Sequence, residues 1–289
     1  MHRLGTLKLP SGACLDFSGP ALIMAIVNCN EDSFYAPSRA LGEGAVAKAL
    51  AAEEDGASVV DFGGESSRPG AAYIGEEEEL KRLIPAIELF RRRSSLPVSV
   101  DTRKAKVAKA ALDAGADIIN DISALADDPE MAAVCASYGA AVVLMHKKGE
   151  PLTMQEAPYY KNPGEEIISF FKSAAERALA SGISPGKIIL DPGFGFGKST
   201  ENNLEILSRL EEICGKVYPV IVGLSRKSFI GEICGRSEAL RDAEERLPGT
   251  LAANAAAIMG GADIIRVHDV KEHVDLAKVL FALGAAASR

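Results

Sequence analysis

Two side chains that can bind an anion stand two residues apart at the end of an apolar run. In IIRVHD (264–269), Arg266 and His268 follow two isoleucines. Side chains alternate between the faces of an extended chain, so these two point the same way. Lys227 directly follows another apolar run, YPVIVGLSR (218–226). Guanidinium and ammonium groups bind phosphate oxygens and an imidazole adds a donor, so these residues predict an anion-binding corner.

A second set of side chains offers acceptors and an amide at the ends of three other apolar runs. These residues are Asp101, Asn120 and Asp191. A flat heterocycle with amino and ring N–H groups needs such partners. Gathering so many ionisable groups is costly unless each has a partner, and folding alone gives no reason to do so. The two sets together predict a pocket for a polar aromatic ring joined to an anionic tail.

Other polar residues at the ends of apolar runs have structural interpretations as well as functional ones. Asp121 is a candidate helix cap, and Asp61 is a candidate partner for loop amides. His146 is either a rim histidine with its hydrogen bonds satisfied or a site residue. His2 and His273 are interpreted as a terminal and a surface residue.

Two features suggest other functions, a phosphate-binding P-loop and a Schiff-base lysine, but the sequence favours neither. GFGFGKST (193–200) resembles a phosphate-binding P-loop, but that motif requires glycine where Pro192 stands, and GxGxxG fails as well. Its glycines favour a tight backbone turn beside a ligand instead. A Schiff-base role for Lys227, as in barrel aldolases, is the alternative to anion binding, which its neighbours favour.

The elements that must position these residues repeat along the chain. Short β-branched runs that end in polar residues alternate with segments of helical periodicity, such as GEGAVAKALAAEEDGA (42–57). Continuous apolar runs are typical of strands buried on both faces, and a glycine often ends the helix before them. Eight strands are expected, within the segments 21–28, 55–64, 96–102, 114–121, 138–146, 187–193, 218–226 and 260–269.

Eight strands alternating with eight helices predict an α/β fold, a (β/α)₈ TIM barrel, with an open doubly wound sheet as the alternative. Residues 6–19 predict a short N-terminal β-hairpin that plugs the bottom of the barrel. No composition break divides the chain, so a single domain over 1–289 is expected, with the barrel over 21–289. The active site of such a barrel lies at the C-terminal ends of its strands.

Composition excludes several classes of function. The 289 residues carry 40 Asp and Glu against 32 Lys and Arg, a formal charge of −8, so nucleic acid is not the expected partner. The five cysteines form no CxxC pair, which argues against a disulfide framework or zinc site and favours a reducing cytoplasm. No apolar run approaches the roughly 18–20 residues of a membrane span, and the start does not read as a signal peptide.

The motifs, taken in order, resemble those of the dihydropteroate synthase family from about residue 21 to 270. No single motif is decisive, but eight in the same order are specific. They are IVNCNEDSF, DFGGESSRPG, SVDTRKAKVAKAAL, GADIINDIS, LMHKKGEPLTMQ, ILDPGFGFGKS, GLSRKSFIG and IRVHDV.

The resemblance implies a transferase of folate biosynthesis. Such enzymes join a hydroxymethyl-dihydropterin diphosphate to 4-aminobenzoate, giving dihydropteroate and diphosphate, by ionisation at the pterin methylene and attack by the amine. The resemblance implies that the catalytic residues are Asp32, Lys227, Arg266 and His268. Asp32 would stabilise the cation that forms at the pterin methylene. The resemblance also implies Mg²⁺ as a cofactor, shared between the diphosphate and Asn28. The loops 29–40 and 63–75 would exclude water.

The resemblance also assigns residues to each part of the substrates. The pterin ring would bind Asp101, Asn120, Met145, Asp191 and Lys227. The diphosphate would bind Asn28, Arg266 and His268. The aminobenzoate would bind Phe34, Ser67, Arg68, Pro69 and Ser228, the last at a helix N-terminus that favours an anion.

The first loop departs from the family pattern. Asn30 and Glu31 replace the usual Thr-Pro before Asp32, which frees the backbone and adds a charge. This departure leaves open a pterin-binding paralogue without activity. The pterin-binding barrel of a corrinoid-dependent methyltransferase, which shares the fold and the ring-binding carboxylates, is the other alternative. The family is commonly homodimeric, and the small-residue segment GTLAANAAAIMGG (249–261) suits either a partner or the chain's own barrel.

Overall fold

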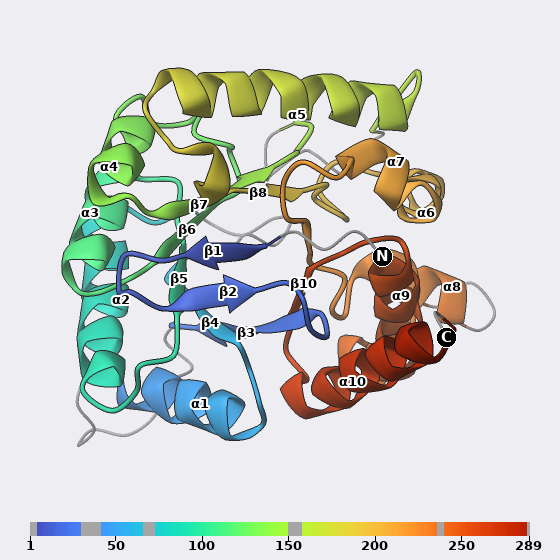
Figure 1. Ribbon diagram of the computed structural model, residues 1–289, viewed down its shortest axis with the longest axis horizontal. Coiled ribbons are helices and arrows are strands. Elements are labelled where there is room, and N and C mark those ends of the chain that lie inside the picture. The colour runs from blue at the N-terminus through green and yellow to red at the C-terminus, as the bar shows by residue number, and fades with distance from the viewer. Residues whose placement is uncertain (1–4, 30–41, 66–72, 150–157, 236–239, 288–289) are drawn as a thin grey trace.

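A computed structural model of the chain describes residues 5–29, 42–65, 73–149, 158–235 and 240–287. Within these residues eight parallel strands form one sheet, surrounded by a ring of helices (Figure 1). A parallel bridge between Leu190 and Val220 joins the two edge strands, so the sheet closes into the predicted barrel. The strands are β3 (Leu22–Asn28), β4 (Val59–Gly63), β5 (Val98–Asp101), β6 (Ile118–Asp121), β7 (Ala141–Met145), β8 (Ile188–Asp191), β9 (Ile221–Val222) and β10 (Ile264–Val267).

Helices follow the strands and cover the outside of the barrel. The N-termini of two of them are capped by their sequence: Asn162 and Pro163 begin one helix, and Ser199 with Asn202 forms a capping box on another. The described helices are α1 (Glu43–Glu54), α2 (Glu76–Arg91), α3 (Ala105–Asp113), α4 (Met131–Tyr138), α5 (Pro163–Ala180), α6 (Thr200–Ser208), α7 (Leu210–Cys214), α8 (Ser228–Cys234), α9 (Leu247–Met259) and α10 (Val270–Ala287), with 3₁₀ turns η2 (Pro185–Lys187) and η3 (Ala243–Arg246).

The strands divide their residues between two buried surfaces. One set packs against the helices, as Val60 and Phe62 do on β4. The alternate set fills the barrel interior, and burying each large side chain there stabilises the fold by about 1.5–3 kcal/mol. This interior cluster includes Met24, Val59, Ile118, Val143, Ile189, Ile221 and Ile264.

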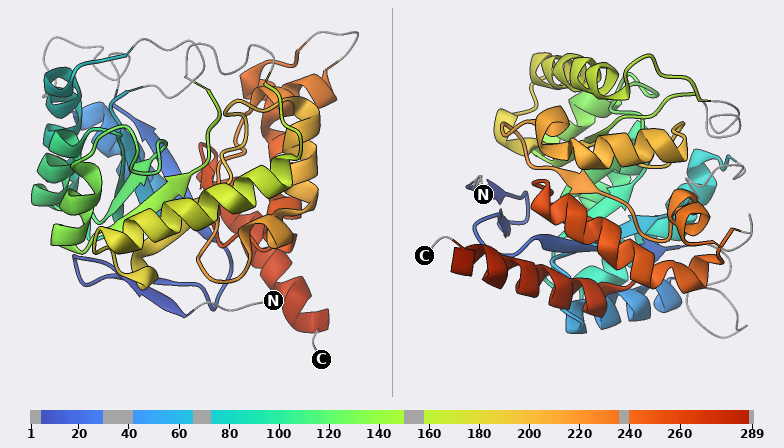
Figure 2. Two further views of the ribbon diagram at one scale, coloured as in Figure 1. Left: turned by 90° about the horizontal axis from the view of Figure 1, so that it is seen from above. Right: turned by 90° about the vertical axis from the view of Figure 1, so that its right-hand side faces the viewer.

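The N-terminal hairpin closes the lower end of the barrel, as predicted. Strands β1 (Thr6–Lys8) and β2 (Cys14–Asp16) are antiparallel, with Leu7 opposite Leu15. Both leucines, together with Phe17, are buried in the interior cluster beneath the strands. The hairpin therefore lies at the opposite end of the barrel from the C-terminal ends of the strands (Figure 2).

A cavity of 510 Å³ lies at the same end as the hairpin, beside α7, α9 and α10. Phe17, Leu210, Tyr218 and Leu280 are among the residues that line it. It lies away from the C-terminal strand ends, where barrel active sites occur. No described helix has the length and apolar character needed to cross a membrane.

Candidate active site

The polar residues predicted from sequence meet at the C-terminal ends of the strands. Strand register places Asn28 beside Gly63, Gly63 beside Asp101, and Asp101 beside Asn120. These residues have the same parity along their strands as the interior apolar layer, so their side chains continue that layer upward. On the other side of the barrel, Met145 pairs with Asp191. The side chains of Asp101, Asn120, Met145 and Asp191 are buried.

Arg266 lies among the carboxylates of this interior layer. Its Nε donates to Asp61 Oδ2 at 2.6 Å, and a terminal nitrogen donates to Asp101 Oδ2 at 3.0 Å. Asn120 donates to the same oxygen of Asp61 at 3.2 Å. Arg266 therefore joins the two predicted halves of the pocket, and its role toward a diphosphate stays a prediction. The interpretation of Asp61 as a partner for loop amides is wrong: its carboxylate accepts from Arg266 and Asn120 inside the site.

Burial controls the protonation of the acceptors. It raises the pKa of Asp101 to about 7, an effect that outweighs the opposing charge of Arg266, and the carboxylate of Asp61 raises this pKa further. Burial also raises the pKa of Asp191, while the Gly193 N–H opposes the shift. Their raised pKa values and their position at the C-terminal strand ends make these two carboxyl groups candidates for a ligand site.

Protonation of Asp101 should weaken pterin binding at acidic pH. Ring N–H groups need an ionised acceptor, so affinity for the pterin should rise as pH increases from about 5.5 toward about 7, the pKa of this carboxyl. Asp101→Asn should bind the pterin more weakly and lose most of this rise. Titration calorimetry with a pterin alcohol measures both effects. If pterin affinity in Asp101→Asn still rose with pH as in the wild type, the pH dependence would belong to another group.

Asp191 is oriented by the loop that follows β8. The N–H of Gly193 donates to its Oδ1 at 2.7 Å, and its main-chain carbonyl accepts from the N–H of His146 at 2.9 Å. From the same loop, the ring of Phe196 lies 4.2 Å from the Lys227 ammonium. This part of the site therefore presents a buried carboxylate and a cation whose places depend on one loop.

The corner formed by the ends of β9 and β10 contains His268, as predicted. Its Nδ1 lies 3.0 Å from Ser225 Oγ, which also accepts the main-chain N–H of His268. Because Oγ is already an acceptor, its own hydrogen can go to Nδ1, which leaves the ring proton on Nε2 as a donor for an anion. The neighbouring Arg226 adopts a left-handed φ of 59° and bonds Asp269 through both Nε and a terminal nitrogen.

For the remaining predicted site residues, the structure either gives a position in the fold or does not describe the residue. Ser228 is exposed and is the first residue of α8, so its predicted position at a helix start is confirmed. Asn28 ends β3. Five residues lie outside the described ranges, and their roles stay predictions: Asp32, Phe34, Ser67, Arg68 and Pro69.

Three other polar residues serve the fold around the site. Asp121 bonds Ser123 and the N–H of Leu125, so it holds a turn, and its interpretation as a helix cap is wrong. His146 is buried against Phe170 outside the barrel, where burial lowers its pKa to about 2 and keeps it neutral. The surface interpretation of His273 is wrong: it is fully buried, and it bonds Asn254 and the carbonyl of Asp269.

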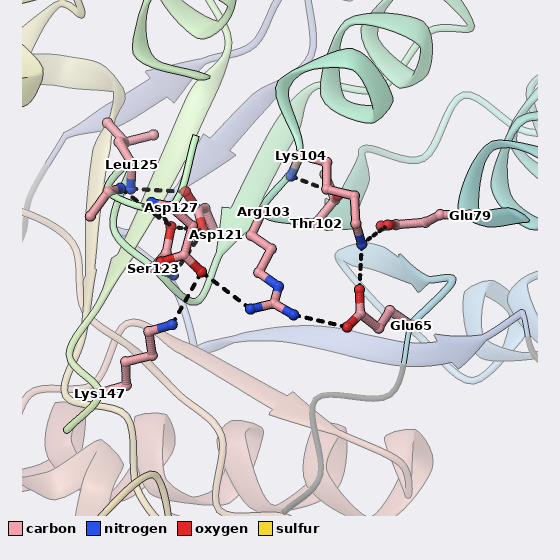
Figure 3. Close-up of polar contacts among 11 residues, drawn as sticks. Glu65, Glu79, Thr102, Arg103, Lys104, Asp121, Ser123, Leu125, Asp127 and Lys147 are labelled. Atoms are coloured by element: carbon pink, nitrogen blue, oxygen red, sulfur yellow. Dashed lines mark hydrogen bonds and ion pairs between the residues drawn. The ribbon is translucent and has the colours of Figure 1, made fainter. Parts of the chain in front are cut away.

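A chain of alternating charges connects the strand ends around one side of the site (Figure 3). Arg103 pairs with Glu65 at 3.1 Å and with Asp127 at 3.3 Å, and Lys147 pairs with Asp127 at 3.2 Å. Lys104 continues the chain from Glu65 to a carboxylate on α2. The network ties together the segments after β4, β5, β6 and β7, and so fixes the rim around Asp101 and Asn120.

Comparison with known proteins identifies the family. A family model described as pterin binding enzyme matches residues 24–268. The dihydropteroate synthase of Synechocystis sp. is 42% identical over 277 residues, which are 95% of this chain and 94% of the relative. The chain belongs to the pterin-binding enzyme family, and its resemblance to dihydropteroate synthases is confirmed.

Solved structures agree with this assignment. Dihydropteroate synthase from Xanthomonas albilineans with 4-aminobenzoic acid superposes with a TM-score of 0.88 at 40% identity, covering 97% of this chain and 99% of that one. The same enzyme in complex with 7,8-dihydropteroate gives 0.85 at 38% identity, with the same coverage.

Proposed function

We propose that this chain is a dihydropteroate synthase, which condenses 6-hydroxymethyl-7,8-dihydropterin diphosphate with 4-aminobenzoate. The observation that carries the proposal is the division of the barrel mouth. Asp101, Asn120 and Asp191 offer partners for a polar ring, and His268, at the corner formed by the ends of β9 and β10, offers a donor for an anion. Relatives that match nearly the whole chain have this activity in their names.

The layout suits a reaction in which the leaving group departs before the amine attacks. An arylamine is a weak nucleophile, so the electrophile must be activated. The bond between the pterin methylene and the diphosphate breaks, the ring spreads the positive charge, and the amine then forms the new C–N bond and loses its proton. Arg266 and His268 stabilise the charge that develops on the diphosphate, and the predicted role of Asp32 is to stabilise the cation.

The residues at this end of the barrel fit Mg²⁺ carried by the diphosphate. The described residues contain no cluster of three His, Cys, Asp or Glu able to hold a metal alone. Mg²⁺ keeps several waters and needs only one or two protein oxygens beside substrate phosphates. The side-chain oxygen of Asn28, which lies near Gly63 at the strand ends, would be such a ligand. When bound, the ion neutralises charge on the leaving diphosphate.

A coupled assay tests the proposal. The protein is supplied with both substrates and Mg²⁺, and diphosphate release and dihydropteroate formation are followed together. The proposal predicts diphosphate and dihydropteroate in equal amounts, with diphosphate release dependent on 4-aminobenzoate. Pterin binding without turnover would indicate the inactive paralogue instead. Methyl transfer from a methylated folate would indicate the methyltransferase.

The β10 histidine gives a selective prediction. His268→Ala removes a donor from the anion corner and leaves the carboxylates that bind the ring unchanged. Affinity should therefore fall about tenfold or more for the pterin diphosphate and less than about twofold for the pterin alcohol. Calorimetry with the two ligands gives the comparison. Equal losses for both ligands would contradict a role for His268 at the diphosphate.

The assembly and the compartment are further parts of the proposal. Large apolar side chains are exposed along α9 and α10, with Met259 at 78%, Leu283 at 61% and Val279 at 58% exposure. Their positions support a homodimer, which light scattering of the purified protein tests directly. All five cysteines are free thiols, which supports a reducing cytoplasm.

A further inference from the structure

A buried lysine lies behind the pterin half of the site and takes no part in the reaction described above. Lys198 is 3% exposed. Its ammonium donates to three main-chain carbonyl oxygens, those of Gly193 at 2.9 Å, Phe196 at 3.1 Å and His146 at 3.2 Å. An ammonium has three donors, so all of them are used. Burying a charge is costly even when it is hydrogen-bonded, so the fold alone does not account for a lysine here.

The three carbonyls join two segments at the top of the barrel. One follows β7, and the other is the loop 192–199 between β8 and α6. Gly193, Gly195 and Gly197 all have left-handed φ values, of 66°, 76° and 65°. A Cβ at the first or the third would overlap a main-chain carbonyl oxygen that follows β7. The loop therefore has one tight conformation pressed against β7, and Lys198 bonds both sides of this contact.

The carbonyls that Lys198 bonds belong to the residues that orient the site. Gly193 donates its N–H to the carboxylate of Asp191, and Phe196 places its ring against the ammonium of Lys227. We propose that Lys198 is a positioning residue of the pterin site, whose ammonium fixes this loop so that Asp191 and Lys227 keep their places. This inference rests on the proposed function, because it names a residue that serves the same pterin.

The charge of Lys198 adds a second effect on the same carboxylate. Lys198, Lys227 and Arg266 each lower the pKa of Asp191, against the burial that raises it. Burial lowers the pKa of Lys198 itself to about 7, with Asp191 opposing the shift and Lys227 and Lys148 adding to it. His146, whose carbonyl accepts from Lys198, is neutral. Lys198 is thus charged below about pH 7 and loses its charge above that value.

The test measures pterin affinity across pH for two substitutions. Lys198→Met keeps the length of the side chain without its charge, and Lys198→Arg keeps a charge. At pH values just below neutrality, Lys198→Met should bind the pterin alcohol about tenfold more weakly than the wild type. Wild-type affinity should fall above about pH 7 and approach that of Lys198→Met by about pH 9. In Lys198→Met this alkaline fall should be absent, and Lys198→Arg should recover part of the affinity without it.

Arg91→Met is the matched control at the other end of the barrel. Arg91 also bonds two main-chain carbonyls, those of Leu96 and Gly115, and a buried carboxylate, that of Asp117. Arg91→Met should lower the melting temperature and leave pterin affinity unchanged. If Lys198→Met had wild-type pterin affinity and a wild-type pH profile, this inference would be overturned and the proposed function would not be affected. If Lys198→Met does not fold, Lys198→Arg with an unchanged alkaline fall would overturn it. Absence of pterin binding by the wild type would overturn the proposed function first.

Discussion

Replacement of Arg266 by methionine should lower the free energy of unfolding by about 3 kcal/mol and kcat/KM by about a thousandfold. Arg266 bonds two carboxylates that are almost fully buried, on Asp61 and Asp101. Without the guanidinium these two charges face each other unpaired. The pKa of Asp101, which Arg266 lowers, would then rise further, and the carboxyl would hold its proton at neutral pH.

The loss from Arg266→Met should therefore extend to the ring as well as to the diphosphate. A protonated Asp101 is a poor acceptor, so affinity for the pterin alcohol should fall along with affinity for the diphosphate ester. His268→Ala, which should affect the ester alone, is the internal comparison. Urea denaturation gives the stability, and calorimetry with both ligands gives the affinities. Unchanged affinity for the alcohol in Arg266→Met would show that the guanidinium does not organise the ring site.

The second large effect is expected for Asp191→Asn. The carboxylate is buried, and its position is set by the N–H of Gly193. Asparagine keeps the shape of the side chain but removes its charge. Its NH₂ group, which is a donor, would face either the donors of the ligand or the N–H of Gly193. A buried hydrogen bond to a charged group is worth about 1.5–3 kcal/mol, so pterin affinity should fall about tenfold to a hundredfold.

Asp117→Asn is the control for this substitution. Asp117 is a fully buried carboxylate at the lower end of the barrel, where it accepts from Arg91 and from the N–H groups of Ser11 and Val98. The variant should lose stability and keep its pterin affinity. If both variants lose affinity equally, the loss reflects the fold rather than contact with the ring.

The convergence of the site was predictable because it depends on strand parity. Asp101, Asn120 and Asp191 stand at the ends of apolar runs whose direction in a barrel is fixed, so their meeting point follows from the fold class alone. The same parity places Arg266 and His268 in the interior. The hairpin was predictable because two short extended pieces flank a turn sequence.

The pairings between these residues were not predictable in the same way. Arg266 bonds Asp61, 205 residues away in the chain, and only the register between β10, β3 and β4 brings the two together. Lys198 stands in a glycine-rich segment that resembles a loop, and its burial depends on how that loop packs against β7. His273 is in a helix with polar neighbours, so its contact with α9 left no pattern in the sequence.

A crystal structure of the protein with the pterin diphosphate and Mg²⁺ would show directly whether the ring and the diphosphate bind on different sides of the barrel mouth. We expect the edge of the ring against Asp101, Asn120 and Asp191, and the diphosphate beside Arg266 and His268. A ligand seated elsewhere, for example in the 510 Å³ cavity beside α7, α9 and α10, or bound with its ring and tail exchanged, would contradict the account.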